Sequence, residues 1–204
     1  MYSCCIPDDY DASAYSDRPA TRWTTYIDWL RPACEKLVAQ GRIGAWGITG
    51  IGIPDPIVAA LSGTPQPGIV QCISNPIDSV GELQYFSGPT RAREIIGKAK
   101  ANNIGVMGVR AVQGGAFTGA VDRVLPHDHG VMADFNRAAG FRALASELCQ
   151  SAAALAHRYA LSMDGVDTVV PGVKNRAELT ECLTAEAAGP LDTALMARVT
   201  SSFT

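Results

Sequence analysis

The sequence has no strong excess of charge of either sign and few aromatic residues. Its 204 residues include 17 Lys and Arg against 20 Asp and Glu, a formal net charge of −3, and only 7% are aromatic. Without a basic block, electrostatic binding to nucleic acid or to a membrane surface is not expected. No apolar run approaches the roughly 18 residues of a membrane span. Because roughly 100–200 residues form one domain, we expect a single soluble, cytoplasmic domain over residues 1–204.

Metal-binding patterns are also missing. The chain has six cysteines but no C-x-x-C motif, and its three histidines are His127, His129 and His157. Their spacing completes no zinc site, and the His127-Asp128-His129 cluster has no third ligand in view. We therefore predict no metal site. Reduced thiols that act as small hydrophobic side chains are expected, and His157 is expected to be a structural histidine.

Short apolar runs alternate with segments of helical spacing. Residues 1–22 hold acids, prolines and small polar residues, which indicates a loop. The predicted strands cover 43–48, 69–73, 104–109 and 167–170. The predicted helices cover 23–40, 56–61, 90–102, 135–149, 150–162, 176–184 and a C-terminal stretch within 186–204. Apolar strands between helices indicate an α/β fold with a parallel sheet, either doubly wound or part of a barrel. The first strand is not followed by G-x-G-x-x-G, which weakens the doubly wound alternative.

In either architecture, ligands bind at the carboxyl ends of the strands. Glycines in VQGGAFTG (112–119) would let the backbone approach a ligand, although a flexible turn explains them equally well. The segment PGVKN (171–175) precedes a helix, so its amides would form a phosphate cradle with Lys174 beside it. The alternative is a solvated lysine in a loop.

Two polar residues interrupt the apolar strands. Gln71 would contact a ligand amide or a neighbouring side chain, because a buried amide needs a hydrogen-bond partner. Arg110 would pair with an acid such as Asp78 or be offered to an anionic ligand. The sequence leaves both pairs of alternatives open.

Four longer segments together resemble the aldo/keto reductase family. EKLVAQGRIGAWGITG (35–50) is similar to the helix and fifth strand of that family's barrel, and IVQCISN (69–75) to its sixth strand. GVMGVRAVQGGAFTG (105–119) resembles its seventh strand and pyrophosphate-covering loop. LAHRYALSMDGVDTVVPGVKNRAELTEC (155–182) is similar to its eighth strand and adenosine-phosphate segment. The resemblance covers roughly residues 23–185.

The resemblance implies a partial (β/α)₈ TIM barrel of about four parallel strands, the fifth to eighth units, with NADP(H) as cofactor. Gln71 stands where a glutamine contacts the nicotinamide amide, and Lys174 replaces an arginine at the adenosine 2′-phosphate. Glu178 and Cys182 replace a glutamine and an asparagine at the adenine. The implied cofactor-binding residues are Thr49, Gln71, Arg110, Gln113, Gly114, Gly115, Gly172, Val173, Lys174, Asn175 and Glu178.

The family's catalytic residues have no clear counterpart in this chain. Its aspartate, tyrosine and lysine come from the first three barrel units, which this sequence lacks, and Tyr2 falls where its histidine belongs. Carbonyl reduction needs a proton donor to the developing alkoxide. Tyr10 and Tyr15 lie in a loop with no lysine nearby. We therefore assign no catalytic residue.

Three hypotheses remain open at this point. The chain is a reductase that uses NADPH to reduce a small aldehyde or ketone by hydride transfer. Alternatively, it is a non-catalytic half-barrel that binds a nucleotide or a partner. A homodimer through the open sheet edges is one such assembly, because unpaired strand edges favour association. The third hypothesis is a fragment of a longer reductase.

Overall fold

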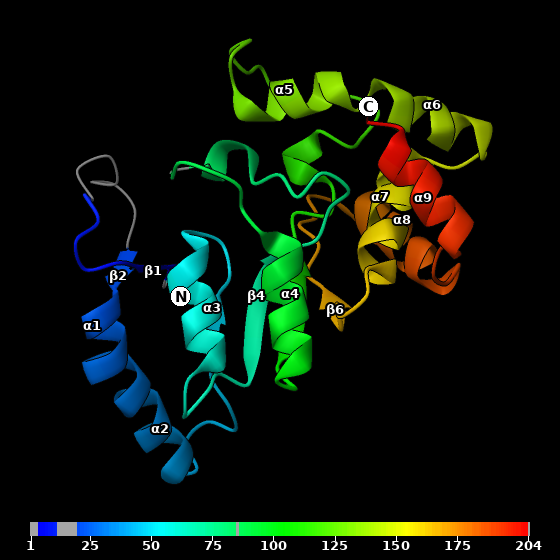
Figure 1. The fold of residues 1–204 in the computed structure, drawn as a ribbon. Coiled ribbons are helices and arrows are strands. Elements are labelled where there is room, and N and C mark those ends of the chain that lie inside the picture. Colours follow the sequence, from blue (N-terminus) through cyan, green and yellow to red (C-terminus); the bar gives the residue numbers. More distant parts are fainter. Residues whose placement is uncertain (1–3, 12–19, 85, 204) are drawn as a thin grey trace. The chain divides into compact units, whose positions relative to one another are not determined.

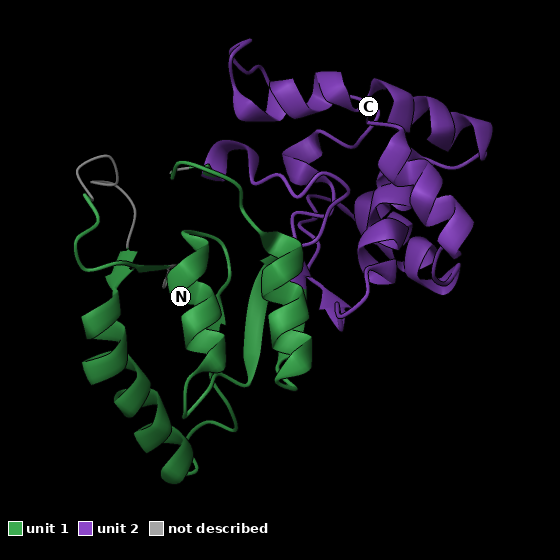
Figure 2. Ribbon diagram, in the orientation of Figure 1, with its two compact units in different colours: residues 1–72, 84–107 green, residues 73–83, 108–204 purple. Residues whose placement is uncertain are grey.

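The computed structural model describes residues 4–11, 20–84 and 86–203 (Figure 1). Tyr2 and Tyr15 lie outside this range. The chain divides into two compact units, which are coloured separately in Figure 2. Unit 1 is made of residues 1–72 and 84–107, and unit 2 of residues 73–83 and 108–204. No helix in the described part of the chain is long and apolar enough to cross a membrane.

Unit 1 contains a two-stranded sheet, a long helical segment and most of a parallel strand pair. Its elements are β1 (Cys4–Ile6), β2 (Ala20–Arg22), α1 (Trp23–Thr25), the π-helical turn η2 (Tyr26–Leu30), α2 (Arg31–Ala39), β3 (Gly47–Thr49), α3 (Pro54–Ser62), β4 (Ile69–Ile73), α4 (Ala92–Ala101) and β5 (Gly105–Val109). Of β4 and β5, only the residues up to Cys72 and Met107 belong to unit 1. β1 and β2 pair in parallel, so the loop predicted over 1–22 is wrong at these two segments. Three-residue strands are too short for a sequence pattern to reveal.

The pairing of β3 with β4 fixes the register of unit 1. Both strands run parallel, with Thr49 opposite Gln71. A Cβ atom on Gly47 would lie 2.6 Å from the Ile69 carbonyl oxygen, so the close approach of the two strands requires glycine here. β3 begins at Gly47 rather than at residue 43. The residues between α2 and β3 form an irregular turn. In this turn the Trp46 indole donates a hydrogen bond to Glu35 Oε1 of α2 at 2.5 Å.

Unit 1 buries its apolar residues between the strands and two helices. α3 and α4 pack against each other beside β4, as Figure 1 shows. Ile57, Leu61 and Ile95 are fully buried there. The strand predicted over 69–73 coincides with β4, and the one over 104–109 differs from β5 by a single residue. The strand order of the four-stranded sheet is β3-β4-β5-β6, which confirms an α/β fold with four main strands.

Unit 2 is mostly helical. It contains the ends of β4 and β5, η3 (Gly81–Leu83), η4 (Gln113–Gly115), α5 (Gly130–Arg137), α6 (Ala139–Glu147), α7 (Ala152–Ser162), β6 (Thr168–Val169), α8 (Arg176–Ala187) and α9 (Thr193–Ser201). The helix predicted over 135–149 is two helices separated at Ala138, and the first begins at Gly130. The C-terminal helix predicted within 186–204 is α9, and α8 also reaches Ala187.

An aromatic cluster holds the segment after β5 against the helices of unit 2. The Phe117 ring lies 5.8 Å from that of Phe141 and 5.4 Å from that of Phe203, measured between centroids. Phe117 and Phe141 are completely buried, as are Leu155 and Ala156 of α7. Burial of two aromatic rings fixes the backbone that leads from β5 into the site.

Candidate functional site

A pocket with a volume of about 920 Å³ lies within unit 2. It is bordered by the end of β5 and the segment that follows, by α7, by residues 170–174 after β6, and by the first turns of α8. These are carboxyl ends of strands, where the sequence places a ligand site. The ionisable and hydroxyl side chains that line it are Arg110, Thr118, Asp122, Arg123, Ser151, His157, Lys174, Glu178, Glu181 and Cys182. Basic and acidic groups are therefore balanced.

The N-terminus of α8 is capped by side chains of its own segment. Asn175 is the N-cap, and its Oδ1 accepts the Glu178 N–H at 3.0 Å. The Glu178 carboxylate in turn accepts the backbone N–H of Lys174 at 2.8 Å and Asn175 Nδ2 at 3.1 Å. This is a capping arrangement that satisfies donors at the helix end. A carboxylate thus occupies the position predicted for a phosphate.

Lys174 is ion-paired rather than simply solvated. Its ammonium contacts Asp122, from the segment after β5, and lies 3.5 Å from Glu178 Oε1. The hydrogen bond with Asp122 raises the pKa of Lys174, and the same bond lowers the pKa of Asp122. The Lys174 side chain is 63% exposed, so the pair remains open to exchange with a ligand.

Arg110 pairs with an acid, which is one of the two alternatives that the sequence leaves open for this residue. The acid is Glu82 of η3 rather than Asp78, with Nη1 donating to Oε1 at 3.0 Å. Its Nε donates to Gln113 Oε1 at 2.8 Å. Arg110 adopts a left-handed backbone conformation, with φ of +62°, which turns the chain sharply out of β5. The turn directs the following residues to the pocket.

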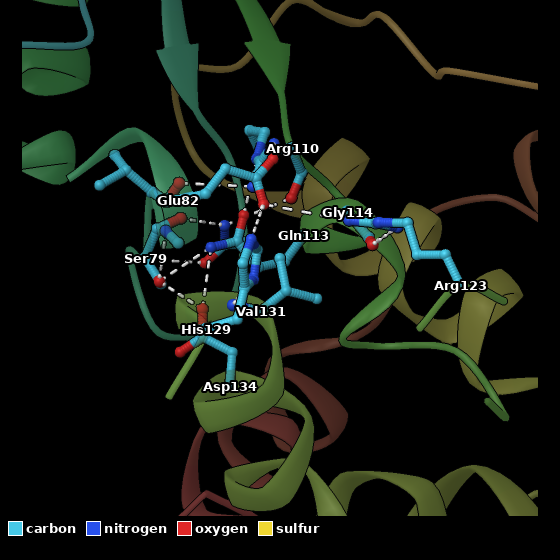
Figure 3. A network of polar contacts seen from close by, with 12 residues as sticks. Ser79, Glu82, Arg110, Gln113, Gly114, Arg123, His129, Val131 and Asp134 are labelled. Carbon is cyan, nitrogen blue, oxygen red and sulfur yellow. Dashed lines mark hydrogen bonds and ion pairs between the residues drawn. The ribbon is translucent and has the colours of Figure 1, made fainter. Parts of the chain in front are cut away.

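A buried network fixes the start of the segment after β5 (Figure 3). Gln113 Nε2 donates to Asp134 Oδ2 at 2.9 Å and to Ser79 Oγ at 2.8 Å, and Ser79 Oγ donates to Asp134 Oδ2 at 2.5 Å. Gln113 is completely buried and Asp134 is 4% exposed. The Gln113 side chain therefore points into the network, and its backbone leads to Gly114 and Gly115. Burial with full hydrogen bonding makes such a network rigid.

Glycines form the part of the pocket wall nearest to the network. Gly114 and Gly115 have φ values of +60° and +97°, a region that other residues rarely adopt. The Gly114 carbonyl accepts a hydrogen bond from Arg123 Nη1 at 2.8 Å. On the opposite segment, a Cβ atom added to Gly172 would have no neighbour within 4 Å. Backbone is thus exposed to a ligand on two sides.

His157 and Cys182 meet at the pocket wall. His157 Nε2 lies 3.3 Å from Cys182 Sγ, joining α7 to α8. Burial lowers the pKa of His157, and burial followed by the charges of Glu181 and Glu178 raises the pKa of Cys182. Both effects favour a neutral imidazole beside a protonated thiol. Neither shift activates Cys182 as a nucleophile.

Two candidate residues belong to unit 1. Thr49 and Gln71 are opposite each other at the ends of β3 and β4. Gln71 Nε2 lies 3.8 Å from Met107 Sδ, a weak acceptor. Contact with a neighbouring side chain is one of the two alternatives that the sequence leaves open for Gln71.

Among the candidates in unit 2, the structure brings seven to one pocket: Arg110, Gly114, Gly115, Gly172, Val173, Lys174 and Glu178. The side chains of Gln113 and Asn175 are engaged in the network and in the helix cap. Sequence reasoning missed Asp122 and Arg123, which line the pocket from a segment without periodicity. It also missed Ser79 and Asp134, since nothing in the sequence links them to Gln113.

The described residues contain no group of three potential ligand side chains placed to hold a metal ion. His129 instead caps α5, with Nδ1 accepting the Val131 N–H at 3.2 Å. In the N-terminal segment, Tyr10 donates its backbone N–H to the Pro7 carbonyl at 3.2 Å.

A comparison with family models gives a match to the aldo/keto reductase family over residues 7–203. The chain belongs to the aldo/keto reductase family. The match extends beyond residues 23–185, where the sequence resemblance ends. A comparison with curated proteins found no match.

Solved structures of similar fold are also aldo-keto reductases. Aldo-keto reductase AKR11C1 from Bacillus halodurans, in its holo form, has 18% identity and a TM-score of 0.63, with 99% of this chain and 60% of that chain covered. The glycerol dehydrogenase AKR11B4 from Gluconobacter oxydans has 18% identity and a TM-score of 0.64, with 100% and 58% covered. The fold is therefore α/β and related to a (β/α) barrel. The chain spans about three fifths of the length of these neighbours.

Proposed function

We propose that the chain is a partial aldo/keto reductase barrel, equivalent to the fifth to eighth β/α units, that binds a nicotinamide adenine dinucleotide in the unit 2 pocket. The observation that carries this proposal is the convergence of seven candidate residues on one pocket at the ends of β5 and β6. Its volume of about 920 Å³ falls within the range typical of cofactor sites. The family generally uses NAD(P)H, which agrees with such a ligand.

The pocket offers groups suited to the pyrophosphate and to the adenosine of the dinucleotide. Backbone at Gly114, Gly115 and Gly172 is accessible to a pyrophosphate, and Arg123 adds a positive charge. Lys174 and Glu178 would lie near the adenosine, as the resemblance implies. Gln113 would act as a positioning residue, because its side chain is held by Asp134 and the next two residues, Gly114 and Gly115, line the pocket.

Thr49 and Gln71 belong to unit 1 and are not assigned to the unit 2 pocket. When bound, the cofactor supplies a hydride to a small aldehyde or ketone, which is the general activity of the family. For this chain alone we propose binding without carbonyl reduction, because no residue is assigned as proton donor.

Titration of the purified chain with NADH and NADPH, followed by cofactor fluorescence, tests the proposal. We expect binding in the micromolar range for at least one of them. Gly172→Leu should abolish binding without unfolding the chain, since the added side chain enters open space in the pocket. Gly44→Leu is the matched control, because it also enters open space but lies outside the pocket. Absence of binding in the unmodified chain, or equal binding by Gly172→Leu, would contradict the proposal.

One observation favours the second candidate, a half-barrel that associates with a second copy. Exposed apolar side chains lie directly after β6, the edge strand of its sheet, and on α8: Val170, Val173, Leu179 and Leu183. In α8, only Ala185 is fully buried. Apolar groups so exposed at a sheet edge favour association. We propose a homodimer that uses this surface.

A further inference from the structure

We infer that the unit 2 pocket selects NAD(H), which has a free ribose 2′-hydroxyl, over NADP(H), and that Glu178 and Asp122 set this preference. The inference rests on the proposed function, which places the adenosine beside Lys174. Lys174 alone would favour NADP(H), because a lysine can bind the 2′-phosphate. The inference predicts the opposite preference. The two forms differ only by the 2′-phosphate, so the charges around that position decide between them.

Glu178 already holds the place of an anion at the start of α8. Its carboxylate accepts the Lys174 backbone N–H at 2.8 Å and Asn175 Nδ2 at 3.1 Å. Asn175 Oδ1 accepts the Glu178 N–H at 3.0 Å. A phosphate that sought these donors would have to displace an intramolecular carboxylate. The helix N-terminus therefore has little left to offer a second anion.

The Lys174 ammonium is compensated by two acids. It contacts Asp122 and lies 3.5 Å from Glu178 Oε1, and Asp122 also lies 3.6 Å from Arg123 Nη1, so these two acids are balanced by two cations. Each exposed pair is weak and can open for a ligand. When it opens, however, the carboxylates stay at the pocket wall, where Glu181 adds a third. A dianionic phosphate would meet like charge there.

A ribose hydroxyl meets the opposite situation. It can donate a hydrogen bond to a carboxylate, and bonds to a charged acceptor are stronger than bonds between neutral groups. Dinucleotide sites of other folds follow the same chemistry, with an acidic residue for the 2′-hydroxyl and a basic one for the 2′-phosphate. Here the three acids Asp122, Glu178 and Glu181 outnumber the two nearby cations, Lys174 and Arg123. The geometry therefore suits the unphosphorylated ribose.

The pyrophosphate, common to both forms, is not affected by this argument. It would face the backbone of Gly114 and Gly115 and the Arg123 guanidinium, which bonds to the Gly114 carbonyl at 2.8 Å. Discrimination is thus confined to the 2′ position. We expect NADH to bind at least about fivefold more tightly than NADPH at low salt.

The test is a fluorescence titration of the full chain and three variants with NADH and with NADPH. Glu178→Gln and Asp122→Asn each remove one of the charges, and the ratio of the two dissociation constants should shift toward NADPH by about tenfold or less in each. Asp122→Asn leaves the α8 cap intact, so it stays informative if Glu178→Gln weakens the helix. Glu186→Gln, an exposed residue of the same helix outside the pocket, should leave the ratio unchanged.

Each outcome has one meaning. Tighter NADH binding, with the ratio shifted in both variants, supports the inference. Tighter NADPH binding by the unmodified chain overturns the inference and leaves the proposed function standing. Tighter NADH binding with an unchanged ratio in both variants overturns the role of the two carboxylates. If neither dinucleotide binds, the proposed function fails, and the inference fails with it.

Discussion

Gln113 Nε2 donates a hydrogen bond to Asp134 Oδ2 at 2.9 Å, and both side chains are buried. The bond joins the turn after β5 to α5, as Figure 3 shows. Gln113 does not line the pocket itself, but its buried side chain fixes the backbone that leads to Gly114 and Gly115 in the pocket wall. The same contact makes the stability of unit 2 depend on a carboxylate, that of Asp134, which no sequence pattern singles out.

Asp134→Ala should destabilise the chain. The variant removes the acceptor of both Gln113 and Ser79, and the loss of a buried hydrogen-bonded charge costs about 2–4 kcal/mol. Urea unfolding followed by circular dichroism measures the change. Asp28→Ala, an exposed acid of the N-terminal helical segment, should stay within about 0.5 kcal/mol of the unmodified chain. Equal stabilities of the two variants would show that the network contributes little.

Stability should fall as the pH drops below the ordinary pKa of histidine. Burial lowers the pKa of His157 from its ordinary value of 6.5, so the unfolded chain binds the proton more readily than the folded one. The contribution is fully present above pH 6.5 and is lost as the pH falls from there through the folded pKa. Urea unfolding at several pH values should show a smaller loss in His157→Gln. An identical pH profile for this variant would exclude His157 as the source.

Bound dinucleotide should protect Cys182 from alkylation. Cys182 lines the pocket, whereas the exposed Cys149 does not. Because its pKa is raised, Cys182 should react slowly with a maleimide near neutral pH even without ligand. Mass spectrometry of peptides after timed labelling gives both rates in one sample. Protection of Cys149 to the same degree would indicate a general effect on the chain rather than occupation of the pocket.

Replacing the exposed leucines of α8 should weaken self-association. Leu179 and Leu183 are 45% and 60% exposed and lie one helical turn apart. If a second copy covers them, Leu179→Ser with Leu183→Ser should convert a dimer into a monomer, as measured by light scattering after size exclusion. Val124→Ser is the control, because Val124 is also exposed but lies in a loop. A monomeric unmodified chain would contradict the homodimer.

The main elements of the fold were predictable because they are long or strongly apolar. β4 over Ile69–Ile73 coincides with its predicted range, and α4 follows a clear helical spacing. The short strands β1 and β2 have no such pattern, since three residues show no period. The break at Ala138 was also invisible, because arginine before it and alanine at 138 and 139 all favour helix. Tertiary packing, rather than local preference, decides these points.

The candidate site was predictable only where glycine or charge stands directly after a strand. Gly114, Gly172 and Lys174 satisfy this condition, and the structure brings them to one pocket. Asp122 comes from a segment without periodicity, and its contact with Lys174 joins positions far apart in the chain. Pairings of this kind depend on the path of the backbone, which no spacing in the sequence reveals.

Hydrogen–deuterium exchange of the full chain, with and without saturating NADH, tests the central claim most directly. Binding in the unit 2 pocket should slow exchange in two segments, the residues after β5 around Gly114 and the residues from Gly172 into α8. Unit 1 helices such as α2 should exchange as before. Protection confined to the two segments is the result that this account predicts. Absence of protection with either NADH or NADPH, or protection only elsewhere in the chain, would contradict it.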